Sequence, residues 1–253
     1  MQLYGASDGD PPEFARACGV AYYALIPAAG SGTRFLDSTP KQYLPLAGRP
    51  MLWHAVRAVC RPPIENVFVV LTPGDAQFAR LDWSAFGGRV EPLYCGGETR
   101  RDSVHDGLAA AMAAVDADDW VLVHDAARPC LPERDLRQLI EEVRGDAIGG
   151  VLALPSADTV KRAAKDEAGT LRIAATEDRS QLWLAQTPQM FRGGLLLEAL
   201  AAAPATITDE AGAVERMGLR PRLVAGSREN IKVTYREDLA IAAAILAARG
   251  EAA

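Results

Sequence analysis

Two cations follow a glycine-rich stretch near the start of the chain. The stretch reads "IPAAGSGTRF" at residues 26–35, and "PKQYLPLAGRPML" follows shortly after it. Gly30 and Gly32 let the backbone turn sharply and approach a ligand closely, so that successive N–H groups can surround an anion. Arg34 offers a two-pronged donor and Lys41 a point charge, which together suit the phosphates of a nucleotide. The pattern therefore indicates a phosphate-binding loop.

This stretch differs from two common phosphate-binding motifs. A P-loop has its lysine directly after a glycine and before Ser or Thr, whereas Lys41 follows Pro40. The dinucleotide fingerprint requires a glycine where this chain has Phe35. Cations in this arrangement would favour attack on the α-phosphate of a triphosphate, because negative charge grows on its oxygens and on the departing pyrophosphate. A tight turn with two solvated cations is the alternative.

A second glycine pair stands in "CGGETRRDSV", residues 95–104. The backbone of Gly96 and Gly97 could bond the edge of a nucleobase, and the Ser103 hydroxyl could add a contact. The alternative is a plain turn from a strand into a helix, with Thr99 as the helix cap.

The third stretch, "VHDAARP" at residues 123–129, places a carboxylate and a guanidinium at the end of a strand. Asp125 could bind Mg²⁺ or a substrate hydroxyl and Arg128 a phosphate, or the two could simply form an ion pair. His124 should point to the opposite face and lie in the core, because side chains alternate along a strand. Arg100 and Arg101, upstream, are expected to be solvated or structural rather than catalytic.

Further candidates lie in the second half of the chain. Lys232 falls in "NIKVT", residues 230–234, which we interpret as an apolar strand, so the lysine either faces solvent or points into a site. Thr208 and Asp209 form a natural cap for an amphipathic helix. No histidine or carboxylate pair resembles a general base. A phosphate monoester acting as nucleophile needs none, since its second pKa is about 6.

The elements that position these residues alternate between strand-like and helix-like segments. Such alternation predicts an α/β fold, a Rossmann-like and mostly parallel sheet with helices on both faces, in which ligands bind beyond the carboxyl ends of the strands. Strands are expected at residues 20–27, 66–71, 120–129 (running into a polar turn), 149–155, 221–227 and 230–234, and helices at 50–60, 99–115, 132–144 and 236–249.

Residues 156–181 do not fit this alternation. They are polar with an alternating pattern and contain a turn at Gly169, which predicts a protruding β-hairpin arm. A hairpin of this length is marginal alone, and its edges invite pairing. It is either a solvent-exposed insertion or an arm that packs on a second subunit.

Composition narrows the class of protein. Of the 253 residues, 49% are hydrophobic. The net charge is −6 and the pI is about 5.2, and this acidic balance argues against broad nucleic-acid binding. The four cysteines are scattered and no zinc spacing exists. No signal peptide or apolar run of membrane-spanning length is evident, so we expect a cytoplasmic protein with no membrane or nucleic-acid partner.

Taken together, the motifs resemble one enzyme family. "PAAGSGTRF…PKQYLPLAGRPML", "GGETRRDSV", "VHDAARP", "DTVKR", "LAQTPQMF", "TDEAGAVE" and "ENIKVT" occur in the order seen in 2-C-methyl-D-erythritol 4-phosphate cytidylyltransferases, over residues 21–248. The resemblance implies the nucleotidyltransferase form of the α/β fold, similar to glycosyltransferase-A. It also implies that CTP and methylerythritol phosphate react, with Mg²⁺ as cofactor, to give a diphosphocytidyl alcohol and pyrophosphate. The substrate phosphate would attack the α-phosphate directly.

The same resemblance assigns roles by motif position. The catalytic residues would be Arg34, Lys41, Arg179 and Lys232. The nucleotide would be bound by Ala28, Ala29, Gly30, Gly32, Gly96, Gly97 and Ser103. The second substrate would be bound by Asp125, Arg128, Thr159 and Thr187, with Arg179 and Lys232 also contacting it. No metal ligands are assigned, because Mg²⁺ would be held mainly through the CTP phosphates, with Asp125 as the candidate protein ligand.

The resemblance further implies a homodimer whose arms cross, so that Thr159 and Arg179 would serve the partner's site. We expect a single nucleotidyltransferase domain at residues 20–253, with the dimerisation arm at about 156–181 and a loose N-terminal extension at 1–19. Two alternatives stay open: a cytidylyltransferase acting on ribitol 5-phosphate, and a nucleotide-binding regulator without catalysis. Intact Arg34, Lys41 and Lys232 argue against the regulator.

Overall fold

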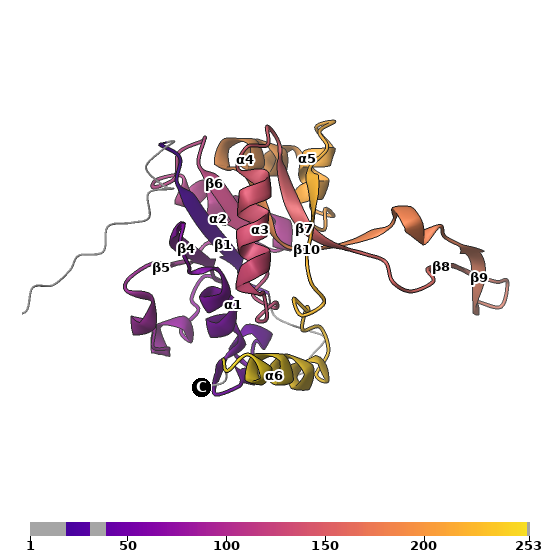
Figure 1. Ribbon diagram of the computed structural model, residues 1–253, viewed down its shortest axis with the longest axis horizontal. Coiled ribbons are helices and arrows are strands. Elements are labelled where there is room, and N and C mark those ends of the chain that lie inside the picture. The colour runs from indigo at the N-terminus through magenta and orange to yellow at the C-terminus, as the bar shows by residue number, and fades with distance from the viewer. Residues whose placement is uncertain (1–18, 31–38, 252–253) are drawn as a thin grey trace, which may run out of the picture.

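A twisted seven-stranded sheet forms the centre of the computed structural model, which describes residues 19–30 and 39–251 (Figure 1). The strand order is β11-β7-β10-β6-β1-β4-β5. Strand β10 runs antiparallel to its neighbours β6 and β7, and all the other strands of this sheet run in one direction. The predicted α/β fold with a mostly parallel sheet is therefore confirmed. The strands are β1 Tyr22–Pro27, β4 Ile64–Val70, β5 Val90–Leu93, β6 Trp120–Val123, β7 Gly149–Pro155, β10 Trp183–Arg192 and β11 Arg222–Ala225.

Alternation along the strands divides the interior into two layers, one on each face of the sheet. In β1, Ala24 and Ile26 point into a cluster that includes side chains of α1 and α3, whereas Leu25 points into a cluster with α2 and α4. Each strand thus contributes side chains to both cores, as expected for a sheet covered on both faces. The helices are α1 Met51–Val59, α2 Arg100–Ala111, α3 Glu133–Val143, α4 Gly193–Ala202, α5 Glu210–Glu215 and α6 Asp238–Ala248.

The carboxyl ends of the central strands meet at one edge of the sheet. Pro27 is paired with Val70, and Leu25 with Val123, so the segments that follow β1, β4 and β6 emerge together. Hydrogen bonds extend this register past the strands, since Ala28 N–H donates to the Val70 carbonyl at 2.8 Å. Parallel pairing therefore brings the motifs after these strands to a common place.

The last helix, α6, closes this edge from outside the sheet. Ala242 and Leu246 of α6 belong to a small buried cluster with Met51, Ala127 and Val233. Two short strands, β2 Pro45–Leu46 and β3 Arg49–Pro50, pair beside it. This cluster ties the chain after Lys41 to the chain after β6. In the described part of the molecule, no helix is both long and apolar enough to cross a bilayer.

The expected strand at 230–234 was wrong. These residues form no strand; instead Val233 N–H donates to the Ala127 carbonyl at 2.8 Å, and the Asn230 carbonyl accepts from Arg128 at 2.6 Å. The segment crosses over the turn after β6, and its backbone groups bond to that turn rather than to a neighbouring strand. Its apolar residues are explained by contact with α6 and not by a sheet.

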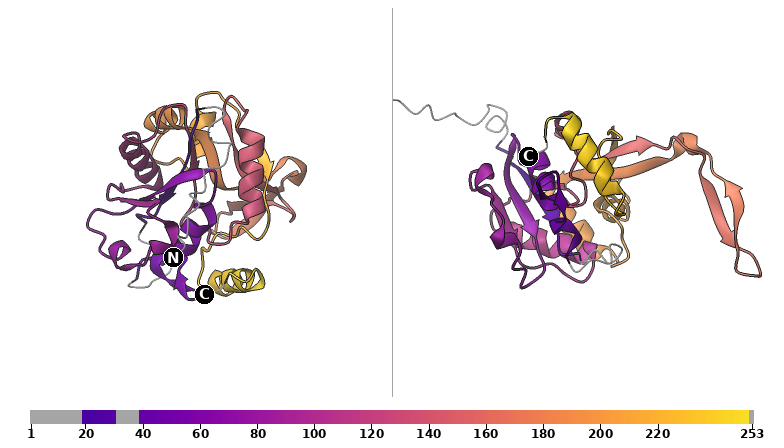
Figure 2. Two further views of the ribbon diagram at one scale, coloured as in Figure 1. Left: turned by 60° about the vertical axis from the view of Figure 1, so that its left-hand side comes forward. Right: turned by 90° about the horizontal axis from the view of Figure 1, so that it is seen from below.

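The arm projects far from the sheet, as Figures 1 and 2 show. Its hairpin consists of β8 Lys161–Lys165 and β9 Leu171–Thr176, which pair antiparallel, with Gly169 at φ +79° in the turn. The predicted hairpin and its turn are therefore confirmed. Leu171 and Ile173 are each 68% exposed, so the arm presents apolar side chains to its surroundings.

Candidate active site

A hollow of about 400 Å³ opens at the carboxyl edge of the sheet. It lies where β1 ends and where α2 begins, and the turn after β6 forms its floor with the segment around Lys232. The predicted site residues that line it are Ala28, Ala29, Gly30, Lys41, Gly97, Ser103, Asp125 and Lys232. Segments distant in the sequence are thus brought to one cavity.

The glycine pair before α2 is required by close packing. A Cβ on Gly96 would lie 2.2 Å from the Ala29 Cβ and 2.9 Å from the Leu71 carbonyl oxygen, and a Cβ on Gly97 would lie 2.5 Å from the Asp102 Cβ. Gly96 therefore lets the β1 loop and the β5 end approach each other, while Gly97 lines the hollow. The Gly96 N–H donates to the Leu71 carbonyl at 2.8 Å, so Gly96 is also tied to the segment that directly follows β4.

The start of α2 is a capping box, as the alternative reading of Thr99 anticipated. Thr99 Oγ1 accepts from the Asp102 N–H at 3.1 Å, and Asp102 accepts from the Thr99 N–H at 3.2 Å. Ser103 is buried, and its hydroxyl lies 3.0 Å from the Thr99 carbonyl. The cap thus holds the Ser103 oxygen at the hollow as an acceptor.

Asp125 stands at the centre of the charged groups of the site. One of its oxygens lies 3.0 Å from Arg100 and the other 2.7 Å from the Lys232 ammonium, while Arg128 is 3.9 Å away. Burial alone would raise the pKa of Asp125, but these cations together hold that pKa well below its usual range. The predicted Asp125–Arg128 pair exists but is the longest of the three contacts.

A second hollow, of about 210 Å³, adjoins the first. Arg100, Asp125 and Lys232 line both hollows, so they mark the place where the two meet. The second hollow is also lined by Arg128 and Thr187, both predicted to bind the second substrate. The two expected binding regions are therefore adjacent and share a charged boundary.

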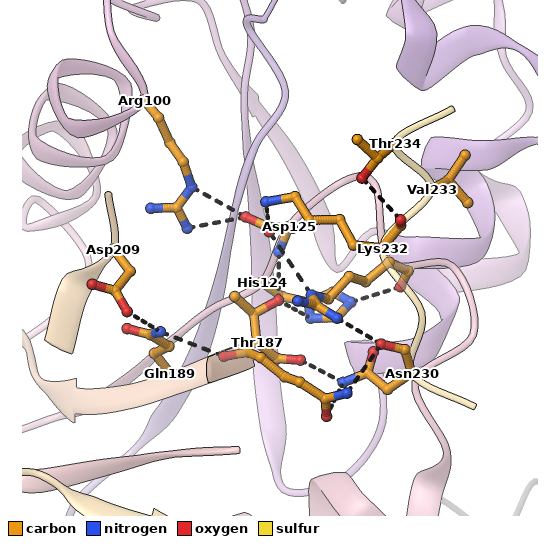
Figure 3. Close-up of polar contacts among 12 residues, drawn as sticks. Arg100, His124, Asp125, Thr187, Gln189, Asp209, Asn230, Lys232, Val233 and Thr234 are labelled. Atoms are coloured by element: carbon orange, nitrogen blue, oxygen red, sulfur yellow. Dashed lines mark hydrogen bonds and ion pairs between the residues drawn. The ribbon is translucent and has the colours of Figure 1, made fainter. Parts of the chain in front are cut away.

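A buried network behind the second hollow holds Asp125 and Thr187 in place (Figure 3). Thr187 Oγ1 accepts from the Asp125 N–H at 3.0 Å and lies 3.1 Å from His124 Nδ1. His124 Nε2 lies 3.0 Å from the Arg128 carbonyl, which can only accept. Asn230, 0% exposed, donates to the Thr187 carbonyl at 2.8 Å. The network joins the β6 turn, β10 and the 230–234 segment.

His124 is a core residue, as expected. Complete burial lowers its pKa to about 4, so the ring is neutral at ordinary pH. In that state Nε2 donates to the Arg128 carbonyl and Nδ1 accepts from Thr187, which leaves neither nitrogen for proton transfer. The histidine orients its neighbours and does not act as a base.

The comparisons with known proteins agree on one family. The family model IspD, 2-C-methyl-D-erythritol 4-phosphate cytidylyltransferase, matches residues 22–248. The chain belongs to this family. The enzyme of that name from Dechloromonas aromatica is 56% identical over 230 residues, covering 90% of this chain and 98% of the relative.

Solved structures of cytidylyltransferases have the same fold. A 4-diphosphocytidyl-2C-methyl-D-erythritol synthase superposes with a TM-score of 0.77 at 40% identity, covering 90% of this chain and 99% of that one. The Francisella tularensis 2-C-methyl-D-erythritol 4-phosphate cytidylyltransferase gives 0.74 at 34% identity, covering 89% and 100%. The family and nucleotidyltransferase fold expected from the motifs are confirmed.

Some predicted residues of this cytidylyltransferase lie away from the two hollows. Thr159 and Arg179 are exposed on the arm and line neither hollow of their own chain, and the Arg179 guanidinium donates to the Ala157 carbonyl. Gly32 and Arg34, together with residues 1–18 of the expected extension at 1–19, fall outside the described residues. Their assigned roles stay predictions.

Arg100 was misjudged from the sequence. It was expected to be solvated or structural, yet it lines both hollows and pairs with Asp125 and the buried Glu210. A signal existed: a cation in the first turn of a helix is unfavourable next to the positive end of the helix dipole, so it needs acidic partners nearby. Asn230 carried no such signal, because its role depends on contacts with distant residues.

The described residues contain no group of three His, Cys, Asp or Glu side chains placed to hold a metal ion. Asp125 has both oxygens engaged by cations. Mg²⁺ takes few protein ligands where phosphates are present. A magnesium ion held mainly by the CTP phosphates, with Asp125 as the candidate protein ligand, stays a prediction.

Proposed function

We propose that this chain joins CTP to 2-C-methyl-D-erythritol 4-phosphate, giving 4-diphosphocytidyl-2-C-methyl-D-erythritol and pyrophosphate. The observation that carries the mechanism is the meeting of two hollows at Arg100, Asp125 and Lys232. One hollow takes the nucleotide and the other the methylerythritol phosphate. A phosphate oxygen of the second substrate then faces the α-phosphorus, forms the new P–O bond, and pyrophosphate leaves.

The larger hollow suits the nucleotide. The backbone from Ala28 to Gly30 and the glycine before α2 provide close approach for a flat base, and Ser103 adds an acceptor. Lys41, together with Arg34 earlier in the same glycine-rich region, supplies positive charge for the triphosphate. Binding cations there stabilise the charge that develops on the α-phosphate and on pyrophosphate.

The smaller hollow suits a polyol phosphate. Thr187, Asp125 and Arg128 line it, so it offers a hydroxyl, a carboxylate and a guanidinium to the hydroxyl groups and phosphate of the acceptor. Lys232 at the boundary is 47% exposed in its side chain and can reach a phosphate on either side. It neutralises repulsion between the two phosphates as they approach.

No protein base is needed for this reaction. The attacking phosphate is largely a dianion at neutral pH, because its second pKa is about 6. This agrees with a site whose one buried histidine, His124, has both ring nitrogens engaged. Catalysis consists of placement and charge stabilisation.

We infer that Mg²⁺ is the cofactor and is held mainly by the CTP phosphates, with Asp125 as the nearby carboxylate. When bound, the ion neutralises phosphate charge and orients the triphosphate for attack. We also infer a cytoplasmic location, which the free thiols of Cys60, Cys95 and Cys130 support.

We infer further that two chains exchange arms. The arm exposes apolar Leu171 and Ile173, whose burial against a second copy would remove them from water. Thr159 and Arg179 lie on this arm and line neither hollow of their own chain. In an exchanged dimer they can complete the partner's smaller hollow, which gives the arm a role in substrate binding.

Pyrophosphate release tests the proposal. The purified chain is supplied with CTP, with and without Mg²⁺, and with either methylerythritol phosphate or ribitol 5-phosphate. We expect rapid release with methylerythritol phosphate and Mg²⁺ together. Release with ribitol 5-phosphate and none with methylerythritol phosphate would show that the chain acts on the alternative substrate. Release with neither, from folded protein that still binds CTP, would indicate a non-catalytic nucleotide-binding protein.

A further inference from the structure

Four side chains of alternating charge form a continuous row through the site. Glu210 in α5 pairs with Arg100 in α2, Arg100 pairs with Asp125 after β6, and Asp125 pairs with Lys232. Figure 3 shows the last three of these residues side by side. The Glu210 side chain is 1% exposed and that of Lys232 is 47% exposed, so the row runs from the interior to the reacting boundary.

The inner half of this row is rigid. Both oxygens of Glu210 accept from Arg100, from Nη1 at 2.6 Å and from Nη2 at 3.1 Å. The other edge of the same guanidinium, Nε and Nη2, lies 3.1 and 3.0 Å from Oδ1 of Asp125. Since the guanidinium is planar, fixing one edge with Glu210 sets the direction in which the other edge holds Asp125.

The outer half of the row places a flexible cation. With Oδ1 held by Arg100, Oδ2 of Asp125 meets the Lys232 ammonium at 2.7 Å, and Arg128 Nε lies farther from the same oxygen, at 3.9 Å. Lysine has a long stem with many rotamers, and here its position is determined by that single carboxylate oxygen among the contacts described. Two of its N–H groups remain to meet phosphates at the boundary of the two hollows.

Glu210 also balances the charge of the row. With it, the two cations of the row face two acids, while Arg128 lies 3.9 Å from Asp125 beside the row. Without it, Arg100 would lose the partner of its inner edge and could rotate to take both oxygens of Asp125, drawing Oδ2 away from Lys232. Glu210 itself lines neither hollow, so it is not placed to touch either substrate.

We propose that Glu210 is a positioning residue, which sets the place of the Lys232 ammonium through Arg100 and Asp125. The inference rests on the proposed cytidylyl transfer and adds a residue to its machinery. It predicts a defect in the chemical step, because misplacing a catalytic cation by about 1 Å can reduce rate about 100-fold. Nucleotide binding in the larger hollow should change little.

The test is a double-mutant cycle on pyrophosphate release, measured under single-turnover conditions with enzyme in excess so that slow variants stay measurable. Glu210→Gln should lower the single-turnover rate about 10- to 100-fold. The KM for CTP, measured separately in the steady state with CTP in excess, should stay near that of the unmodified chain. In a Lys232→Ala background the same substitution should have no further effect, because the cation that it positions is gone. Glu210→Asp, which keeps the charge, should recover part of the rate.

Glu215→Gln is the matched control, since it makes the same change at an exposed position of the same helix. It should behave as the unmodified chain. An equal loss from Glu210→Gln in both backgrounds would overturn the inference, as it would mean a general structural effect. So would full activity of Glu210→Gln.

If Glu210→Gln does not fold, the double variant Arg100→Met, Glu210→Met removes both charges of the inner pair together, which buried pairs tolerate better than removal of one. It should show the same loss of rate, and wild-type rate would contradict the inference. Failure of the unmodified chain to release pyrophosphate would instead overturn the proposed function, and this inference with it.

Discussion

The Lys41 ammonium donates a hydrogen bond to the Val233 carbonyl at 2.8 Å, joining two segments that are 192 residues apart in the sequence. Val233 in turn donates from its N–H to the Ala127 carbonyl at 2.8 Å. The segment that carries Lys232 is therefore held between the phosphate-loop side of the site and the β6 turn. Lys41 and Lys232, both predicted to be catalytic, line the same hollow, and this contact links the segments that carry them.

The first prediction concerns the two cations assigned to the phosphate loop, Arg34 and Lys41. Lys41→Ala, and separately Arg34→Ala, should lower kcat about 100- to 1,000-fold, because each removes a positive charge that stabilises the developing phosphate charge. Thermal unfolding should change little. Pyrophosphate release and a melting curve measure the two effects, and Arg80→Ala, an exposed cation outside both hollows, is the control. Near-normal turnover in both variants would refute the assignment of the loop.

The second prediction concerns the glycine pair. Gly96→Ala should cost about 1–3 kcal/mol of stability and raise the KM for CTP, since the new Cβ would meet Ala29 at 2.2 Å and the Leu71 carbonyl at 2.9 Å. Backbone hydrogen bonds tie Leu71 to Leu93 and to Gly96, so we expect the Ala29 loop to shift instead. Gly145→Ala, which meets nothing within 4 Å, is the matched control. A KM unchanged by Gly96→Ala would argue against a nucleotide at this loop.

The third prediction concerns acid stability. The pKa of His124 falls from 6.5 in the unfolded chain to about 4 in the fold, so the unfolded state binds more protons between these values. Stability should therefore be fully present above pH 6.5 and decline as the pH falls toward 4, by about 3 kcal/mol from this residue. Urea unfolding at several pH values measures the slope. His124→Asn should flatten it, and an unchanged slope would contradict the buried neutral state.

The fourth prediction concerns the arms. If Arg179 serves the partner's site, a heterodimer of one Arg179→Ala chain and one Lys41→Ala chain has one intact site of two, and should show about half of wild-type activity. Each variant alone should be nearly inactive. Differently tagged chains and a two-step purification provide the heterodimer. No recovery in verified heterodimers would place Arg179 in its own chain's site, and a monomer at micromolar concentration would exclude exchange altogether.

The sequence by itself determined the fold class, the family and half of the residues that line the larger hollow. Apolar segments alternate with amphipathic ones, which predicts a layered parallel sheet, and parallel strands necessarily bring the motifs after β1, β5 and β6 to one edge. The glycines, the Thr99 cap and the buried His124 follow from local rules. A pattern of residue types within one stretch suffices to find them, although the packing that requires Gly96, against Ala29 and Leu71, involves residues distant in sequence.

The tertiary structure alone decided how the charges are arranged. Lys232 lies in a segment that looks like a strand, yet it crosses the β6 turn because distant groups, Lys41, Arg128 and Ala127, bond to its backbone. The row from Glu210 through Arg100 and Asp125 joins three separate elements. Charge pairs of this kind depend on distance and burial, and neither is encoded in the spacing of residues along the chain.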